Sequence, residues 1–93
     1  MTELPLDARP RIASKARLMW DKVGKRNMLV FPEASLVLND SATAILKLCN
    51  GERHVEQIVD ELVAQFPGTD RSMIANEVTT LLTRILTRGL LET

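Results

Sequence analysis

The side chains of this sequence that could perform catalysis or hold a metal ion are few and form no motif. The 93 residues include one cysteine and one histidine, Cys49 and His54, whereas a zinc site usually takes four such ligands. The sequence also contains no phosphate-binding loop, no nucleophile elbow and no HExxH motif. We therefore expect a protein that is not an enzyme, with no cofactor and no metal site.

Structural roles account for the same side chains. Cys49 lies on the apolar face of a predicted helix, where a thiol usually packs as a small, unreactive hydrophobic group. His54 stands at the expected start of the next helix, and Gln57 follows it at the spacing of a capping box. The neighbouring acids Asp60 and Glu61 are typical of the solvated face of a helix.

The residues around Gly51 predict two amphipathic helices joined by a tight turn. The apolar run 36–38 lacks helical spacing and predicts a short strand. Asn39 or Asp40 can then cap the helix that ends near Gly51, a residue that tolerates the positive φ of a helix end. Apolar residues recur at spacings of three and four over 55–66, which predicts the second helix. Together these helices form a helix-turn-helix unit.

Two more strands are expected before residue 36. Apolar and polar side chains alternate over 16–21, as they do in a half-buried strand. Residues 22–25 predict a turn, and the strand 27–31 ends at Pro32, which cannot donate to the ladder. With residues 36–38 these strands predict a three-stranded antiparallel meander, which needs helices to cover its apolar face.

The longest helix is expected near the end of the sequence. Asp70 or Ser72 can cap it, its apolar stripe continues to about Arg88, and Gly89 can end it in a left-handed conformation. The stripe is wider than a single helix contact requires. This helix is therefore expected to cover the other two helices and to reach the sheet.

Composition and length are those of one small domain. Residues 1–14 contain two prolines and no periodic pattern, so we expect an extended lead-in there and a single domain over 15–93. The sequence has no apolar run of membrane-spanning length and no apolar signal segment at its start, so we expect a cytoplasmic protein.

The net charge is zero but unevenly distributed. Residues 1–31 carry seven Lys or Arg against three Asp or Glu, and residues 32–93 carry five against nine, which gives +4 and −4. Five cations lie on or beside the first predicted hairpin: Lys15, Arg17, Lys22, Lys25 and Arg26. They form a candidate docking patch for a protein partner, because exposed charge steers association. The alternative is a hairpin whose charges only keep it soluble.

Several stretches of the chain resemble the PqqD family of pyrroloquinoline quinone biosynthesis proteins, from residue 9 to the end. The Cys-Asn-Gly turn between apolar helices is the most specific of them. Two places depart from the family pattern: Asn27 and Met28 stand where the family commonly has an aromatic residue near the start of the second strand, and His54 lies where it usually has Ser or Thr. The matching stretches are RPRI at 9–12, RLMWD at 17–21, LVFPE at 29–33, LNDSATAILKLCNGER at 38–53, IVDEL at 58–62 and RGLLE at 88–92.

The resemblance implies a fold and a function. The fold is α+β and winged-helix-like, a three-stranded antiparallel β-meander followed by a three-helix bundle. The function is that of a peptide chaperone, a recognition element that binds the leader of the ribosomally made precursor PqqA and presents it to the radical-SAM enzyme PqqE. The region 15–93 would then be a PqqD-like peptide-recognition domain.

The resemblance also implies a binding site between the third strand and the last helix. An extended leader would add as a further strand to the 36–38 edge, whose outer hydrogen-bonding groups have no partner in a three-stranded meander. The residues expected to form this site are Leu36, Val37, Leu38, Thr80, Leu81, Arg84 and Arg88.

Two other functions remain open on the sequence. A winged helix-turn-helix can bind DNA, but this requires a basic recognition surface, and after Arg71 the last helix carries only Arg84 and Arg88 against Glu77. We therefore expect no nucleic-acid partner. A structural protein that pairs its edge strand with a second copy, as a homodimer, would instead show no affinity for peptides.

Overall fold

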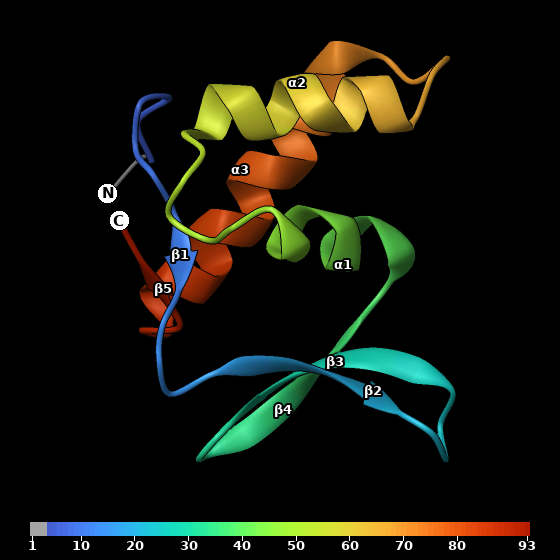
Figure 1. Cartoon of the computed structure of the whole chain (residues 1–93), viewed down its shortest axis with the longest axis vertical. Coiled ribbons are helices and arrows are strands. Elements are labelled where there is room, and N and C mark those ends of the chain that lie inside the picture. The colour runs from blue at the N-terminus through green and yellow to red at the C-terminus, as the bar shows by residue number, and fades with distance from the viewer. Residues whose placement is uncertain (1–3) are drawn as a thin grey trace.

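The computed structural model describes residues 4–93 and divides them into a sheet, three helices and a small strand pair (Figure 1). Residues 1–3, the start of the predicted lead-in, lie outside the described part. The elements in chain order are β1 (Arg11–Ile12), β2 (Arg17–Asp21), β3 (Arg26–Phe31), β4 (Ala34–Leu38), α1 (Asp40–Lys47), α2 (Val55–Gln65), α3 (Arg71–Thr87) and β5 (Leu91–Glu92).

The predicted fold class is confirmed. Strands β2, β3 and β4 form an antiparallel sheet in that order, with β3 in the centre. The three helices lie on one side of this sheet, and α1 is next to it (Figure 1). None of the helices within residues 4–93 is long and apolar enough to cross a membrane.

The β2–β3 turn is organised by Asp21. Its carboxylate accepts a hydrogen bond from the Val23 N–H at 3.1 Å and pairs with Arg26, Nε to Oδ2, at 3.3 Å. The backbone N–H of Gly24, followed by the contacts with Val23 and Arg26, holds the pKa of Asp21 below its ordinary value. Lys25 completes the turn in the left-handed region, at φ 53°.

Each helix begins at one of the caps that the sequence predicts. The Asn39 side chain accepts the Ala42 N–H at 2.8 Å, and Asp70 accepts the Ser72 N–H at 3.1 Å. His54 and Gln57 form the complete capping box. These caps satisfy N–H groups that the first turn of a helix leaves without a partner.

The lead-in supplies the remaining partners at the start of α2. The carbonyl of Ala8 accepts the Val55 N–H at 3.0 Å, and the carbonyl of Leu6 accepts the Glu56 N–H at 3.2 Å. Leu4, earlier in the same segment, is buried in the core. The described part of the lead-in makes a turn, in which the Ala8 N–H bonds to the Pro5 carbonyl at 3.1 Å, and it is docked on the helices through backbone hydrogen bonds that no sequence pattern predicts.

Strands β1 and β5 form a second sheet that the sequence analysis missed. They pair antiparallel, Ile12 with Leu91 and Arg11 with Glu92, and the Arg11 and Glu92 side chains form an ion pair with an Nη2 to Oε1 distance of 2.5 Å. Two-residue strands carry no alternation from which pairing can be predicted.

One apolar core joins these elements. Leu29 of the central strand is completely buried, as are the α3 residues Val78, Leu82 and Ile85. The α3 stripe therefore faces the interior along most of the helix, as its width predicts. The other buried apolar residues of α1 and α2 are Ile45, Leu46, Val55, Ile58, Val59 and Leu62.

Replacing the cap at the β4–α1 junction tests this account. Asn39→Ala is expected to lower the free energy of unfolding by about 1 kcal/mol, because the Ala42 N–H loses its acceptor. Asn39→Asp retains an acceptor and should stay close to the parent. Urea denaturation followed by circular dichroism measures both. Equal losses in the two variants would show that the cap is not the stabilising contact.

Candidate functional site

The outer edge of β4 is the first component of the candidate site. Within residues 4–93, β4 pairs with β3 and with no other strand. Only Pro32 and Glu33 separate the paired residues Phe31 and Ala34. The two residues that flank a two-residue turn bond to each other through their backbone N–H and C=O groups, so Ala34 bonds inward to Phe31. Because these bonds alternate along an antiparallel pair, Leu36 and Leu38 bond inward to β3. The N–H and C=O groups of Ser35 and Val37 therefore point outward.

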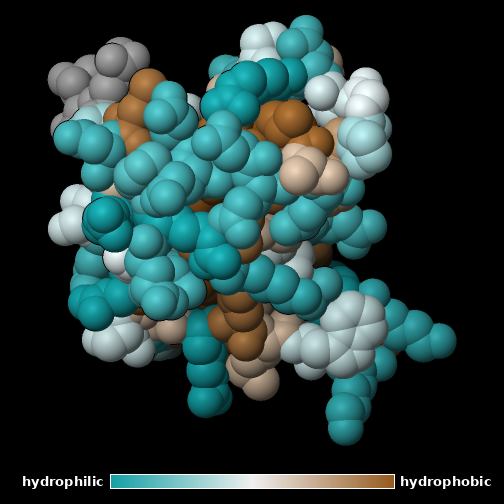
Figure 2. All heavy atoms as spheres, turned by 45° about the horizontal axis from the view of Figure 1, so that its top comes forward, coloured by the Kyte–Doolittle hydropathy of each residue, from teal (hydrophilic) through white to brown (hydrophobic). Residues whose placement is uncertain are grey.

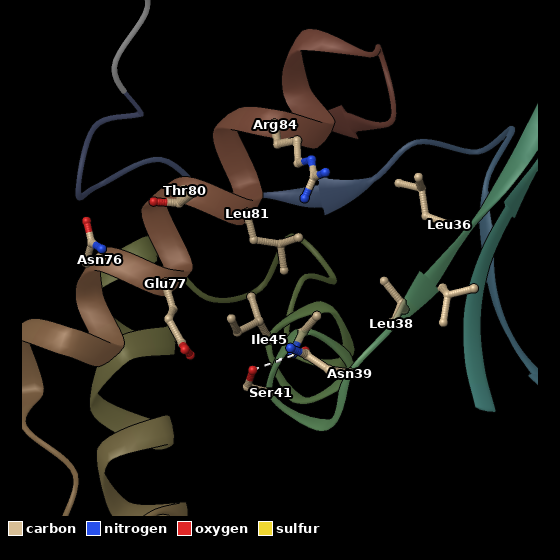
Figure 3. Close-up of a pocket in the computed structure, with 12 residues that line it drawn as sticks. Leu36, Leu38, Asn39, Ser41, Ile45, Asn76, Glu77, Thr80, Leu81 and Arg84 are labelled. Atoms are coloured by element: carbon tan, nitrogen blue, oxygen red, sulfur yellow. Dashed lines mark hydrogen bonds between the residues drawn. The ribbon is translucent and has the colours of Figure 1, made fainter. Parts of the chain in front are cut away.

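A groove of about 560 Å³ borders this edge. It lies between β4, the first half of α1 and the middle of α3 (Figure 3). The residues that line it are Leu36, Val37, Leu38, Asn39, Ser41, Ala42, Ile45, Asn76, Glu77, Thr80, Leu81 and Arg84.

The floor of the groove is apolar. Leu38, Ile45 and Leu81 point toward one another across the space between the three elements (Figure 3). Leu38 and Ile45 are buried, and Leu81 is half-buried. Val37, on the opposite face of the strand, is 58% exposed. An extended segment at this edge would therefore meet backbone groups on one side and apolar side chains beneath it.

Two opposite charges stand at the two ends of the groove. Arg84 extends toward Leu36, and Glu77 extends toward Ser41 and Ile45 (Figure 3). Both charged residues are exposed, and neither forms an ion pair with any residue between 4 and 93. They are seven positions apart on α3, or about 10 Å along the helix axis. The groove is therefore electrically polar, although the chain has no net charge.

The structure brings six of the seven predicted site residues together. Leu36, Val37, Leu38, Thr80, Leu81 and Arg84 all line the groove. Arg88 does not line it and instead forms the C-terminal cap of α3.

Sequence reasoning missed the α1 wall and the acidic end of the groove. Asn39, Ser41 and Ile45 join the site because α1 begins directly at the end of β4, a tertiary arrangement without a local signal. Glu77 could have been found, because it lies two helical turns before Arg84 and therefore on the same face of α3.

The predicted docking cations divide into two groups. Lys15 and Arg17 lie at the start of β2, whereas Lys22, Lys25 and Arg26 lie at the turn that follows it. Arg17 and Lys22 are five positions apart, which is about 16 Å along an extended strand. Figure 2 shows long hydrophilic side chains standing away from the body on the side where this turn lies. Arg26 is partly neutralised by its contact with Asp21.

The two side chains with catalytic or metal-binding potential lie away from the groove. Cys49 is buried, its thiol donates to the Ile45 carbonyl at 3.4 Å, and burial raises its pKa to about 12. His54 is occupied in its capping box. Across residues 4–93, no three His, Cys, Asp or Glu side chains are grouped so that they could hold a metal ion.

Comparisons with known proteins agree on one family. The family model for Coenzyme PQQ synthesis protein D (PqqD) matches residues 26–91. A PqqA binding protein of Rhodopseudomonas palustris (strain BisB5) is 33% identical over 84 residues, which cover 90% of this chain and 81% of that protein. A PqqA binding protein of Methylococcus capsulatus (strain Bath) is 34% identical over 73 residues, 78% of this chain and 75% of that protein.

Two solved structures are similar to this one. The first is the solution structure of the PqqD truncation of Methylobacterium extorquens PqqCD, described as a functional and stand-alone RiPP recognition element. It matches with a TM-score of 0.75 and 31% identity, over 90% of this chain and 88% of that chain. The second is TbiB1 in complex with the TbiA(β) leader peptide, with a TM-score of 0.73 over 88% of this chain and 94% of that chain. At 19% identity the second likeness concerns the fold alone.

The family match covers β3 through to the first residue of β5, so it includes every element that forms the groove. The similar PqqD structure extends the agreement to the spatial arrangement of these elements. This chain therefore belongs to the PqqD family of coenzyme PQQ synthesis proteins.

Proposed function

We propose that this chain binds the leader of a PqqA-type precursor peptide as an added strand on β4 and presents it to the radical-SAM enzyme PqqE. The observation that carries the proposal is the outer edge of β4, which pairs with no strand within residues 4–93 and faces α3 across the groove. Relatives at 33% and 34% identity are described as PqqA binding proteins. Strand addition is a common way for a protein to hold an extended peptide.

The energetics favour a short extended ligand. The outward groups of Ser35 and Val37 provide two donors and two acceptors for a peptide backbone. Apolar side chains of the peptide can then cover the floor formed by Leu38, Ile45 and Leu81. Backbone bonds supply sequence-independent affinity, and contacts with the floor choose among sequences.

The walls of the groove disfavour pairing between two copies of this chain. The β4 strand of a second copy would bring its own sheet and its own α3 to this edge. The space available between β4 and α3 is a groove of about 560 Å³. A single peptide strand fits such a space better than the edge of a folded domain.

Proline substitution on β4 tests strand addition directly. Val37→Pro removes an outward N–H, so the protein should fold while its affinity for a synthetic PqqA leader falls at least about fivefold, the equivalent of one hydrogen bond. Leu36→Pro removes a ladder bond to β3 and a half-buried side chain, so it should lower stability by about 3 kcal/mol. Fluorescence anisotropy measures binding, and thermal unfolding measures stability.

The matched control for the first variant is Val37→Ala, which shortens the same side chain and keeps the N–H. It should bind within about twofold of the parent. If Val37→Pro folds and binds as Val37→Ala does, the leader does not pair with β4. Sedimentation of the parent and of Val37→Pro without peptide tests the alternative that β4 pairs with a second copy. In that case the parent would be a dimer and Val37→Pro a monomer.

Arg84 tests the role of α3 in the groove. Arg84→Ala should weaken binding of an acidic leader about two- to fivefold at low salt, the usual range for an exposed ion pair, and should reduce the salt dependence of the affinity. Arg71→Ala is the control, because Arg71 lies at the other end of α3 and pairs with Asp60. Titrations at several salt concentrations give both quantities. Equal salt slopes for parent and Arg84→Ala would exclude Arg84 from the site.

Presentation to the enzyme requires a second surface that stays accessible while the groove is filled. The β2–β3 turn carries the exposed cations Lys22 and Lys25, and β2, which leads into this turn, lies across β3 from β4. We assign enzyme docking to this turn, together with Arg26 beside it and with Lys15 and Arg17 at the far end of β2. Charge at such a surface accelerates association with an acidic partner, and the effect weakens as salt is added.

Charge reversal at the turn tests this assignment. Lys22→Glu with Lys25→Glu should slow association with PqqE at least about tenfold at low salt and leave leader affinity within about twofold. Arg26 is left unchanged, because reversing it would place two carboxylates together at Asp21. Lys47→Glu, on α1, is the control for a charge change elsewhere. Loss of leader binding with unchanged PqqE association would mean that the two surfaces are assigned the wrong way round.

A further inference from the structure

A second cavity continues the groove at its acidic end. It measures about 210 Å³ and lies between α1, the end of α2 and the first half of α3. Three residues, Ser41, Ile45 and Glu77, line both the groove and this side cavity. Its other lining residues are Leu62, Phe66, Thr69 and Ile74.

The side cavity is apolar inside and open at its rim. Leu62 and Ile74 are almost completely buried, with 2% and 5% of their surface exposed, whereas Phe66 is 39% exposed. Phe66 caps the end of α2, where the chain turns toward α3. An apolar guest would therefore cover the exposed ring of Phe66 and displace water from an apolar wall, which is favourable in proportion to the area covered.

Glu77 gives this end of the groove a negative charge. Its side chain extends toward Ser41 and Ile45, at the junction of the two cavities (Figure 3). A carboxylate in this position favours a neighbouring cation and disfavours an acid. Arg84, at the other end, has the opposite preference.

We propose that the side cavity is an anchor site for the same peptide, which continues past β4, inserts one apolar side chain beside Phe66 and places a Lys or Arg next to Glu77. This inference rests on the proposed function. Glu77 and Arg84 are about 10 Å apart along α3, and an extended peptide covers about 3.3 Å per residue. The bound segment therefore carries a basic residue about three positions from an acidic one, with the apolar anchor beside the basic residue.

Double-mutant cycles between protein and peptide test the anchor. The probes are a synthetic PqqA leader and its single variants, with each apolar residue changed to Ala and each basic residue to Gln. One apolar-to-Ala change in the peptide should weaken its binding to the parent protein about tenfold. The same change should weaken its binding to Phe66→Ala only about twofold, because that variant already lacks the ring that the apolar side chain would cover. One basic change should be coupled in the same way to Glu77→Gln.

Met73→Ala and Glu56→Gln are the matched controls. Met73 is an exposed apolar residue of α3 that lines neither cavity, and Glu56 is an exposed acid of α2 that also lines neither. Neither control should show coupling to any peptide position. Nuclear magnetic resonance adds a direct readout, since the amides of Thr69 and Ile74 should shift with the full leader and not with one that lacks the anchor residue.

The outcomes separate this inference from the proposed function. In one outcome the parent binds the leader, Val37→Pro does not, and Phe66→Ala and Glu77→Gln bind every peptide with the affinity of the parent. This result overturns the anchor site and leaves strand addition in place. If the parent binds no PqqA leader, both proposals fail. Coupling confined to Phe66 and Glu77 supports the anchor.

Discussion

The direct junction of β4 and α1 at Asn39 is the constraint on which the site depends. Leu38 is the last residue of the strand and Asp40 the first of the helix, so one residue makes the whole connection. Its side chain accepts the Ala42 N–H, and its carbonyl accepts both the N–H and the hydroxyl of Thr43. The start of α1 is thereby held at the end of β4. Because α3 packs on α1 and α2, it stands away from the strand, and the groove is the space that remains.

Local signals in the sequence predict the parts of the fold that depend on neighbouring residues. Asn39, His54 and Asp70 each combine a capping side chain with a following apolar pattern, and the helices begin where these residues predict. The alternation over residues 16–21 predicts β2 for the same reason. The groove residues on β4 and α3 were expected because the chain resembles a family, and no pattern of spacing alone would have brought Val37 and Arg84 together.

Features that depend on distant contacts could not be predicted from the sequence. The β1–β5 pair has only two residues in each strand, too few for a period to be visible. The carbonyls of Leu6 and Ala8 accept N–H groups of the first turn of α2. Every residue has a backbone carbonyl, so the residue types at these positions give no sign of the contact. The contribution of α1 to the groove depends on the angle between two elements. Glu77 differs from these cases, since its helical spacing from Arg84 was visible and only its significance was missed.

The pairing of β1 with β5 affects how the chain reaches this structure. Arg11 and Glu92 are 81 positions apart, so their contact closes a loop that contains almost the entire domain. The entropy cost of closing a loop rises with its length, and contacts between distant positions slow folding. During synthesis Arg11 leaves the ribosome long before Glu92 exists. The segment that completes the first turn of α2 can therefore pair its own strand only after Glu92 has been synthesised, whereas β4 and α1 lie much earlier in the chain and can pack before then.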